Sequence, residues 1–255
     1  MGFLDVGKSR LCYEIHGDGP PVVFAHGVGG NRASWFRQVP HLSRTHKVII
    51  FDHRAFGLSS DVEQEGRSRY VDDLEALLDD LGLDRVALVG QSMGGGTCAA
   101  FTCRHPERVT GLVIADSLAG LEAPAPLASA LQATASANRT LSQVERVLGP
   151  TTRQNDPEST LLYLQLASFN SVTVKTVRGS MPPWTSKALE ASGVPVLFIA
   201  GEHDVLFPPA HIAAVAAMVA GARLEIIADA GHSAYFEQAK SFNAILDVFL
   251  ATLGE

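Results

Sequence analysis

Short apolar runs recur along the chain, and each leads into a segment rich in glycine and polar residues. The runs are Val22 to Ala25, Val48 to Phe51, Val86 to Val89, Val109 to Ile114, Val194 to Ala200 and Leu224 to Ala228. A strand that is apolar on both faces must be covered on both faces, so the runs predict a parallel sheet between two layers of helices. Helical patterns separate them, as at Ser68 to Leu81, where apolar residues recur every three or four positions, and one helix is expected from Phe236 to Leu253 at the end of the chain. We therefore expect an α/β fold.

The composition of the 255-residue chain narrows the class of protein. Hydrophobic residues make up 46% and charged residues 18%, which excludes a disordered chain. The formal charge of −7 opposes phosphate backbones and anionic lipid, so we expect neither nucleic acid nor a membrane as partner. Three cysteines, without metal-like spacing or a recognisable targeting segment, predict a cytoplasmic protein.

The α/β alternation is interrupted between residues 118 and 192. This segment is more polar, contains several prolines and has no clear buried strand. We expect it to form short helices inserted at the carboxyl edge of the sheet, as a cap. Residues 1–117 and 193–255 then form one α/β core.

Gly90-Gln91-Ser92-Met93-Gly94 is a G-x-S-x-G motif that follows an apolar strand and precedes a small-residue helix. This is the strand–turn–helix context of a nucleophile elbow, in which a sharp turn exposes the serine oxygen. The two glycines would avoid a collision with the turned chain. Alternatively, Ser92 would merely cap the helix, but the flanking strand and both glycines favour the nucleophile.

A nucleophilic serine needs a base, and the base needs a group that orients it. In this topology the acid and the histidine follow the serine in the chain, at the ends of later strands. Asp204 and His232 both occupy such positions. Glu202 and Asp116 remain alternatives for the acid, and Asp229 is interpreted as a turn residue.

The other histidines have structural interpretations. We expect His26 to bond loop backbone near the site, His203 and His53 to lie behind the site or on the surface, and His105 to end a helix. The sequence contains no cluster of residues with the spacing of metal ligands, so we expect no metal; no cofactor is predicted either.

Acyl transfer also needs two donors directed at the developing oxyanion. The backbone N–H of Met93, the residue after the nucleophile, is one candidate. The loop His26-Gly27-Val28-Gly29-Gly30 supplies the other, for which the Val28 N–H is the best choice. The loop has neither a P-loop lysine nor a full G-x-G-x-x-G, which disfavours a phosphate site.

Taken together, these motifs resemble the α/β-hydrolase fold superfamily over nearly the whole chain. Within it, the chain looks most like the group of 3-oxoadipate enol-lactonases, cofactor-free haloperoxidase-like esterases and carbon–carbon bond hydrolases. The resemblance implies a mostly parallel eight-stranded sheet flanked by helices, an inserted helical cap and a Ser-Asp-His triad. It also implies a small-molecule substrate, and it disfavours haloalkane dehalogenase and epoxide hydrolase activity, because those enzymes carry aspartate where this chain has Ser92.

One position departs from the pattern of the family. Ala55 stands where the family commonly has the first glycine of Asp-x-Arg-Gly-x-Gly-x-Ser. We expect a slightly altered backbone path there, without loss of the chemistry.

Three functions are compatible with these residues. The first is hydrolysis of an ester or lactone of a small, largely apolar metabolite through an acyl-enzyme. The second is carbon–carbon bond hydrolysis of aromatic ring-fission products with the same triad. The third is ligand reception with slow turnover. Apolar residues of the cap and its surroundings are the candidate substrate contacts: Trp35, Phe169, Met181 and Trp184. The sequence predicts no oligomeric state.

Overall fold

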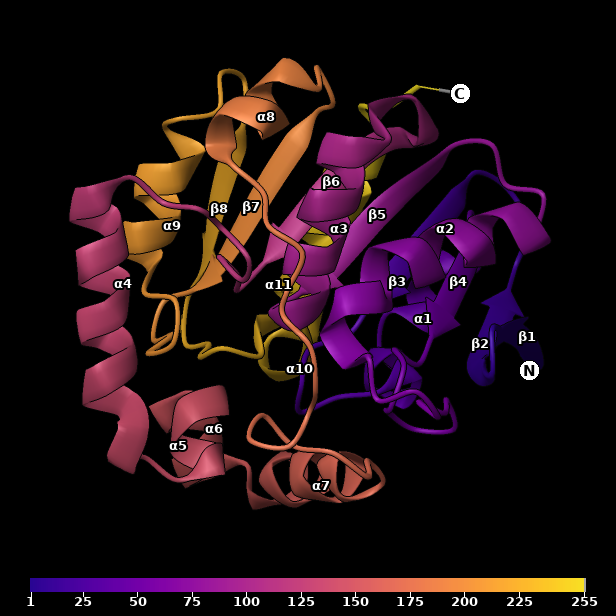
Figure 1. The fold of residues 1–255 in the computed structure, drawn as a ribbon. Helices are drawn as coiled ribbons and strands as arrows, with labels where there is room; N and C mark the ends of the chain where they lie inside the picture. The colour runs from indigo at the N-terminus through magenta and orange to yellow at the C-terminus, as the bar shows by residue number, and fades with distance from the viewer. Residues whose placement is uncertain (255) are drawn as a thin grey trace.

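A computed structural model describes residues 1–254 of the chain and shows an eight-stranded sheet with strand order β1-β2-β4-β3-β5-β6-β7-β8 (Figure 1). Its strands are β1 (Gly2–Val6), β2 (Ser9–His16), β3 (Pro21–Ala25), β4 (Lys47–Phe51), β5 (Val86–Gln91), β6 (Val109–Ala115), β7 (Val196–Gly201) and β8 (Arg223–Ile227). The first two strands pair antiparallel, and the other six run parallel to one another. The predicted, mostly parallel sheet of an α/β fold is confirmed.

Eleven α-helices are present in the described residues, and several of them cover the two faces of the sheet. They are α1 (Val39–Leu42), α2 (Tyr70–Asp80), α3 (Met93–Arg104), α4 (Ala125–Ala137), α5 (Gln143–Val147), α6 (Pro150–Asn155), α7 (Pro157–Ser168), α8 (Ser186–Ala191), α9 (Pro209–Ala216), α10 (Ala234–Glu237) and α11 (Ala239–Leu250). Successive residues of a strand point to opposite faces. Val23 therefore packs in one core with α2, α3, α8 and α9, whereas Val22 and Phe24 pack in the other with α10 and α11.

Two elements differ from the sequence expectation. Strand β1 was not predicted, because its side chains alternate between exposed and half-buried and give little apolar signal. The single helix expected over 236–253 is instead α10 and α11, which meet at Gln238. That residue has φ −121° and ψ 51°, outside the helical region.

The segment between β6 and β7 holds α4 to α8. In Figure 1, α5, α6 and α7 lie beyond one end of the sheet, while α8 lies at the opposite end of the molecule. Helix α8 packs on α3, and its Leu189 is buried in the core of the body. The part that stands away from the sheet is therefore shorter than the predicted range of 118–192.

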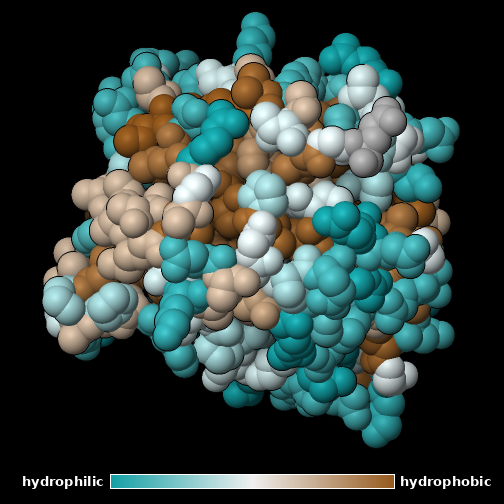
Figure 2. Space-filling model, turned by 90° about the horizontal axis from the view of Figure 1, so that it is seen from above, coloured by the Kyte–Doolittle hydropathy of each residue, from teal (hydrophilic) through white to brown (hydrophobic). Residues whose placement is uncertain are grey.

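Figure 2 shows the face of the molecule opposite α7, where polar side chains cover much of the surface and apolar ones lie between them. Within residues 1–254, no helix combines the length and the apolar character needed to cross a bilayer.

Candidate active site

Ser92 lies in the sharp turn between β5 and α3. Its φ of 50° and ψ of −117° are disfavoured for a residue with a side chain. A Cβ at Gly94 would overlap the carbonyl of Ala25, and one at Gly90 would overlap the backbone of Gly94. The two glycines of the motif are therefore required by close backbone packing. The strained turn leaves Ser92 partly exposed, with its side chain accessible.

Strand β6 supports this turn from the side. The Ser92 N–H donates to the carbonyl of Ala115 at 3.0 Å, and the Ser117 hydroxyl donates to the carbonyl of Ser92 at 2.5 Å. Both partners are buried. These two bonds hold the strained backbone in place, and Ser117 is a supporting residue that the sequence interpretation missed.

The imidazole of His232 joins Ser92 to Asp204. The His232 Nε2 lies 2.8 Å from the Ser92 Oγ, and the His232 Nδ1 lies 2.9 Å from the Asp204 Oδ2. The other oxygen of Asp204 accepts the N–H groups of Leu206 and Phe207. A carboxylate bonded to Nδ1 selects the tautomer whose Nε2 is free to accept a proton. The three predicted side chains are thus brought together in the order that proton transfer from a serine requires.

His232 is buried, and its surroundings change its basicity. Burial disfavours the imidazolium and is the largest single effect, but the nearby carboxylates, Asp204 foremost, together outweigh it, so the pKa of His232 is raised above its ordinary value. Gln91, at the second position of the motif, donates through its amide nitrogen to the carbonyl of His232 at 2.7 Å. The sequence interpretation did not assign Gln91 this contact with the loop that carries His232, although its position next to Ser92 in the motif places it near the site.

Among the described residues, neither alternative acid forms a hydrogen bond to the His232 imidazole. Asp116 is buried at the end of β6, but its oxygens accept backbone N–H groups of Gly201 and Ala234. Glu202 is exposed, and its carboxylate accepts the N–H of Asp229 at 3.1 Å. Geometry therefore favours Asp204 as the partner of His232.

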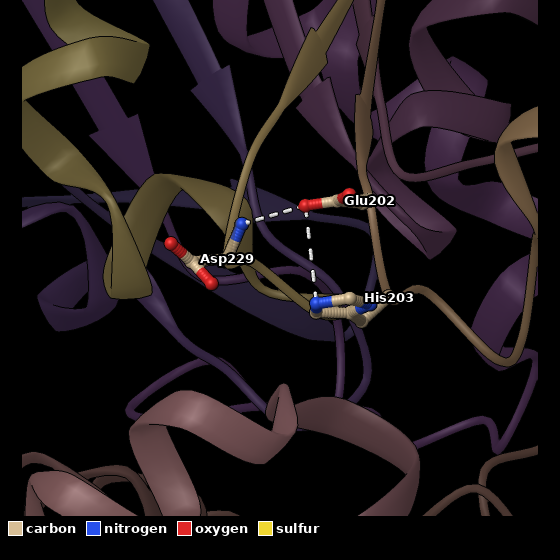
Figure 3. A group of neighbouring side chains, drawn as sticks. All are labelled: Glu202, His203 and Asp229. Carbon is tan, nitrogen blue, oxygen red and sulfur yellow. Dashed lines mark hydrogen bonds and ion pairs between the residues drawn. The ribbon is translucent and has the colours of Figure 1, made fainter.

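Glu202 and His203, which precede Asp204 in its loop, form a small surface cluster with Asp229 (Figure 3), and their potential ligand atoms lie within 4.8 Å of one another. The Glu202 oxygen lies 3.8 Å from the His203 Nε2. All three residues are exposed, and exposed acidic groups often gather without a cation. The cluster alone therefore supports no metal assignment.

The two predicted oxyanion donors lie beside the nucleophile. Met93 opens α3, so its N–H belongs to the first turn, where helical N–H groups lack partners inside the helix. Val28 is in the loop after β3, and a Cβ at the neighbouring Gly27 would touch the Cβ of Ser92 at 3.0 Å. Among the described residues, neither N–H has a hydrogen-bond partner in the protein. Both N–H groups therefore remain candidate donors to an oxyanion.

His26 links the loop after β3, which contains Val28, to the loop after β4. Its Nδ1 donates to the carbonyl of Gly27 at 2.8 Å, and its Nε2 accepts the N–H of His53 at 2.9 Å. Burial lowers its pKa, which keeps the ring neutral in this role. The predicted structural role of His26 is confirmed. His53, in contrast, is not a surface residue, because its ring is fully buried between Phe51 and Tyr70.

The end of α7 is tied to the same loops through Asn170. This side chain donates to the carbonyl of Gly30 at 3.0 Å and accepts the N–H of Gly57 at 3.1 Å. Asn31 donates in return to the carbonyl of Leu166 at 3.0 Å. The helical insertion therefore contacts the loop after β3 directly. The sequence interpretation missed these asparagines, because nothing in their local pattern marks a long-range contact.

The four candidate substrate contacts are in different environments. Met181 packs at the edge of an apolar cluster that contains Met93, Phe56, Tyr70 and Val177, next to the nucleophile. Phe169 is 71% exposed, so it faces water in this structure.

The two tryptophans are structural. Trp35 is fully buried between Phe24 and Tyr235, which corrects its predicted place near the entrance to the site. Trp184 is buried in the core of the body, and its Nε1 donates to the carbonyl of Ala119 at 2.7 Å. Both side chains are buried, so neither can contact a substrate in this structure.

Two surface pockets lie away from the triad. One is lined by residues around His41 and Asp247, and the other by residues around Ser59 and Arg178. Neither lining includes a triad residue.

Ala55 has a backbone conformation that favours glycine. Its φ is 73°, in the left-handed region. The slightly altered path expected at this position stays a prediction, and the conformation itself is disfavoured for alanine. The cost is local strain at a buried position.

The fold and this arrangement of residues define a class of protein, and comparisons with known proteins agree. A family profile described as "alpha/beta hydrolase fold" matches residues 20–171, and a second, described as "TAP-like protein", matches residues 170–254. The chain belongs to the α/β-hydrolase fold family.

Individual relatives are similar over nearly the whole chain. A 2-hydroxymuconate semialdehyde hydrolase of Pseudomonas sp. (strain CF600) is 30% identical, over 97% of this chain and 89% of the relative. A solved thermophilic esterase from Thermogutta terrifontis has a TM-score of 0.81 at 27% identity, covering 97% of this chain and 95% of its own. The solved enol-lactonase from Burkholderia xenovorans LB400 has a TM-score of 0.79 at 25% identity, and the match covers 98% of this chain and 100% of the enol-lactonase chain.

Proposed function

We propose that this protein is a serine hydrolase that cleaves an ester or lactone of a small, largely apolar metabolite. The observation that carries the proposal is the His232 imidazole, with Nε2 2.8 Å from the Ser92 Oγ and Nδ1 2.9 Å from the Asp204 Oδ2. Similarity to an esterase and an enol-lactonase supports the substrate class. The three cysteines are free thiols, in keeping with a cytoplasmic location.

The proposed reaction has two steps. His232 takes the Ser92 proton while the Ser92 Oγ attacks the substrate carbonyl. The resulting oxyanion accepts hydrogen bonds from the backbone N–H groups of Val28 and Met93. His232 then gives its proton to the departing alkoxide. Water, deprotonated by His232, cleaves the acyl-enzyme and restores Ser92. Asp204 holds the imidazole and stabilises its cation throughout.

The apolar cluster beside the site supports the substrate preference. Met93 and Val177 are buried, while Val28, Val172 and Met181 are partly exposed at its edge. Burying an apolar group of the substrate there contributes about 25 cal/mol per Å² of area removed from water. Charged groups would gain nothing from these contacts.

A second reaction, hydrolysis of a carbon–carbon bond in an aromatic ring-fission product, is the alternative. The 30% identity to a 2-hydroxymuconate semialdehyde hydrolase favours it. It would use the same triad, so the site geometry alone does not separate the two reactions.

A substrate panel separates them. Short p-nitrophenyl esters, enol-lactones and ring-fission diketones are assayed side by side on the wild type, Ser92→Ala and the control Ser168→Ala, whose hydroxyl donates only to a backbone carbonyl of α7. We expect the wild type and Ser168→Ala to turn over esters or lactones many times and Ser92→Ala to be inactive. A fluorophosphonate should label the wild type and Ser168→Ala at one site per chain and should not label Ser92→Ala. Turnover of diketones alone would favour the alternative. Undiminished hydrolysis in Ser92→Ala would exclude the serine mechanism.

A further inference from the structure

Asp116 is a buried carboxylate with no direct contact to the reacting atoms. It is fully buried at the end of β6 and has a φ of 48°. A left-handed conformation at a residue with a side chain is disfavoured, and such strain persists only where the surrounding structure imposes it. The backbone is fixed there by its own N–H, which donates to the carbonyl of Ile199 at 2.8 Å.

The two oxygens of Asp116 accept hydrogen bonds from two different loops. The Oδ1 accepts the N–H of Gly201 at 2.7 Å, and the Oδ2 accepts the N–H of Ala234 at 3.2 Å. Gly201 ends β7, three positions before Asp204, and Ala234 follows His232 by two positions. One carboxyl group thus bridges the loop that carries Asp204, here called the acid loop, and the loop that carries His232, here called the histidine loop.

These two loops are in close contact. The N–H of His203 donates to the carbonyl of Ala230 at 2.8 Å, and a Cβ at Gly201 would overlap the backbone of Gly231. A small change in either loop therefore changes the distance between Asp204 and His232. Asp116 lies where it can hold that distance.

We propose that Asp116 is a positioning residue that fixes the acid loop and the histidine loop relative to each other through its bonds to Gly201 and Ala234. This role rests on the proposed serine-hydrolase function. Asp116 does not touch substrate and acts only through Asp204 and His232.

Asp116 is also electrically coupled to the pair that it positions. Burial, reinforced by the nearby Asp204 charge, raises the pKa of Asp116 to about 8. The charged groups that face it are Asp204 and His232. Ionised Asp116 in turn favours the imidazolium of His232. Replacing Asp116 by a neutral residue should therefore lower the pKa of His232, an effect that a merely structural role would not produce.

The test compares Asp116→Asn with Glu202→Gln, which removes an exposed carboxylate from the same acid loop. The amide oxygen of asparagine can still accept a hydrogen bond from one of the two backbone N–H groups. The amide nitrogen is a donor and cannot accept the other, so one of the two bonds is lost. We expect Asp116→Asn to lower kcat by about 10- to 100-fold with little change in KM, whereas Glu202→Gln stays within about twofold. The acidic limb of kcat/KM should have its midpoint at lower pH in Asp116→Asn than in the wild type, because His232 loses its proton more easily without the nearby carboxylate.

A measurement independent of activity accompanies the kinetics. The pKa of His232 is followed by NMR on protein with labelled histidine, using His232→Asn to assign the resonance. We expect a lower pKa in Asp116→Asn and no shift in Glu202→Gln. An unchanged His232 pKa together with unchanged kcat would overturn the role of Asp116. A lowered pKa in a protein that hydrolyses nothing on the substrate panel would instead refute the proposed function and leave the coupling intact.

Discussion

The Nδ1 of His232 lies 2.9 Å from the Oδ2 of Asp204, and both side chains are buried. A buried carboxylate in this position fixes the imidazole tautomer and stabilises its cation. We expect Asp204→Asn to reduce kcat by on the order of 10⁴-fold, as for triads in which only the tautomer is lost. Circular dichroism checks the fold, and ester turnover checks the rate.

Glu202→Gln is the matched control for this substitution, because Glu202 lies in the same loop and is exposed. Its turnover should stay within about twofold of the wild type. A near-normal rate in Asp204→Asn, accompanied by a large loss in Glu202→Gln, would move the orienting role to Glu202.

The raised pKa of His232 predicts the pH dependence of the reaction. The base must be neutral to accept the serine proton, so kcat/KM should fall as the pH falls through the His232 pKa. Because Asp204 raises that pKa, the midpoint of the acidic limb should lie above the ordinary value of about 6.5. In Asp204→Asn the residual activity should have its midpoint at lower pH. An acidic limb in the wild type below pH 6 would contradict the assignment of His232.

The left-handed backbone of Ala55 predicts an unusual gain in stability. Ala55→Gly relieves strain of about 1–2 kcal/mol but increases the freedom of the unfolded chain by about 0.4–1 kcal/mol. We therefore expect the free energy of unfolding to rise by about 0.5 kcal/mol, measured by urea denaturation. Ala133→Gly, in the exposed part of helix α4, is the control and should lose about 1 kcal/mol. A loss in both variants would mean that the Ala55 methyl packs favourably enough to offset its strain.

Trp184 and Phe169 should respond very differently to truncation. Trp184→Ala removes a buried indole and the hydrogen bond to Ala119, so unfolding free energy should fall by about 3–5 kcal/mol. Phe169→Ala removes an exposed ring and should change stability by less than about 0.5 kcal/mol. Urea denaturation of both variants measures the contrast, and a large loss in Phe169→Ala would show that its ring packs in solution.

The sequence predicted the site better than it predicted its surroundings. Ser92, Asp204 and His232 could be found because each follows an apolar strand, and parallel strands bring their carboxyl ends to one edge. Trp35 could not be placed, because an aromatic residue after a glycine-rich loop fits either a pocket wall or a core. The shared role of Asp116 also escaped prediction, since its two partners, Gly201 and Ala234, are backbone groups far away in the sequence.

The two ends of the helical insertion meet where Leu121 pairs with Trp184. The N–H of Glu122 donates to the carbonyl of Trp184 at 2.8 Å, and the N–H of Trp184 donates to the carbonyl of Gly120 at 3.0 Å. Because the chain leaves and returns at one clamped point, the length of the intervening segment adds little to the entropy of closing it. Evolution can therefore lengthen, shorten or exchange this segment without moving the strands that position Ser92, Asp204 and His232.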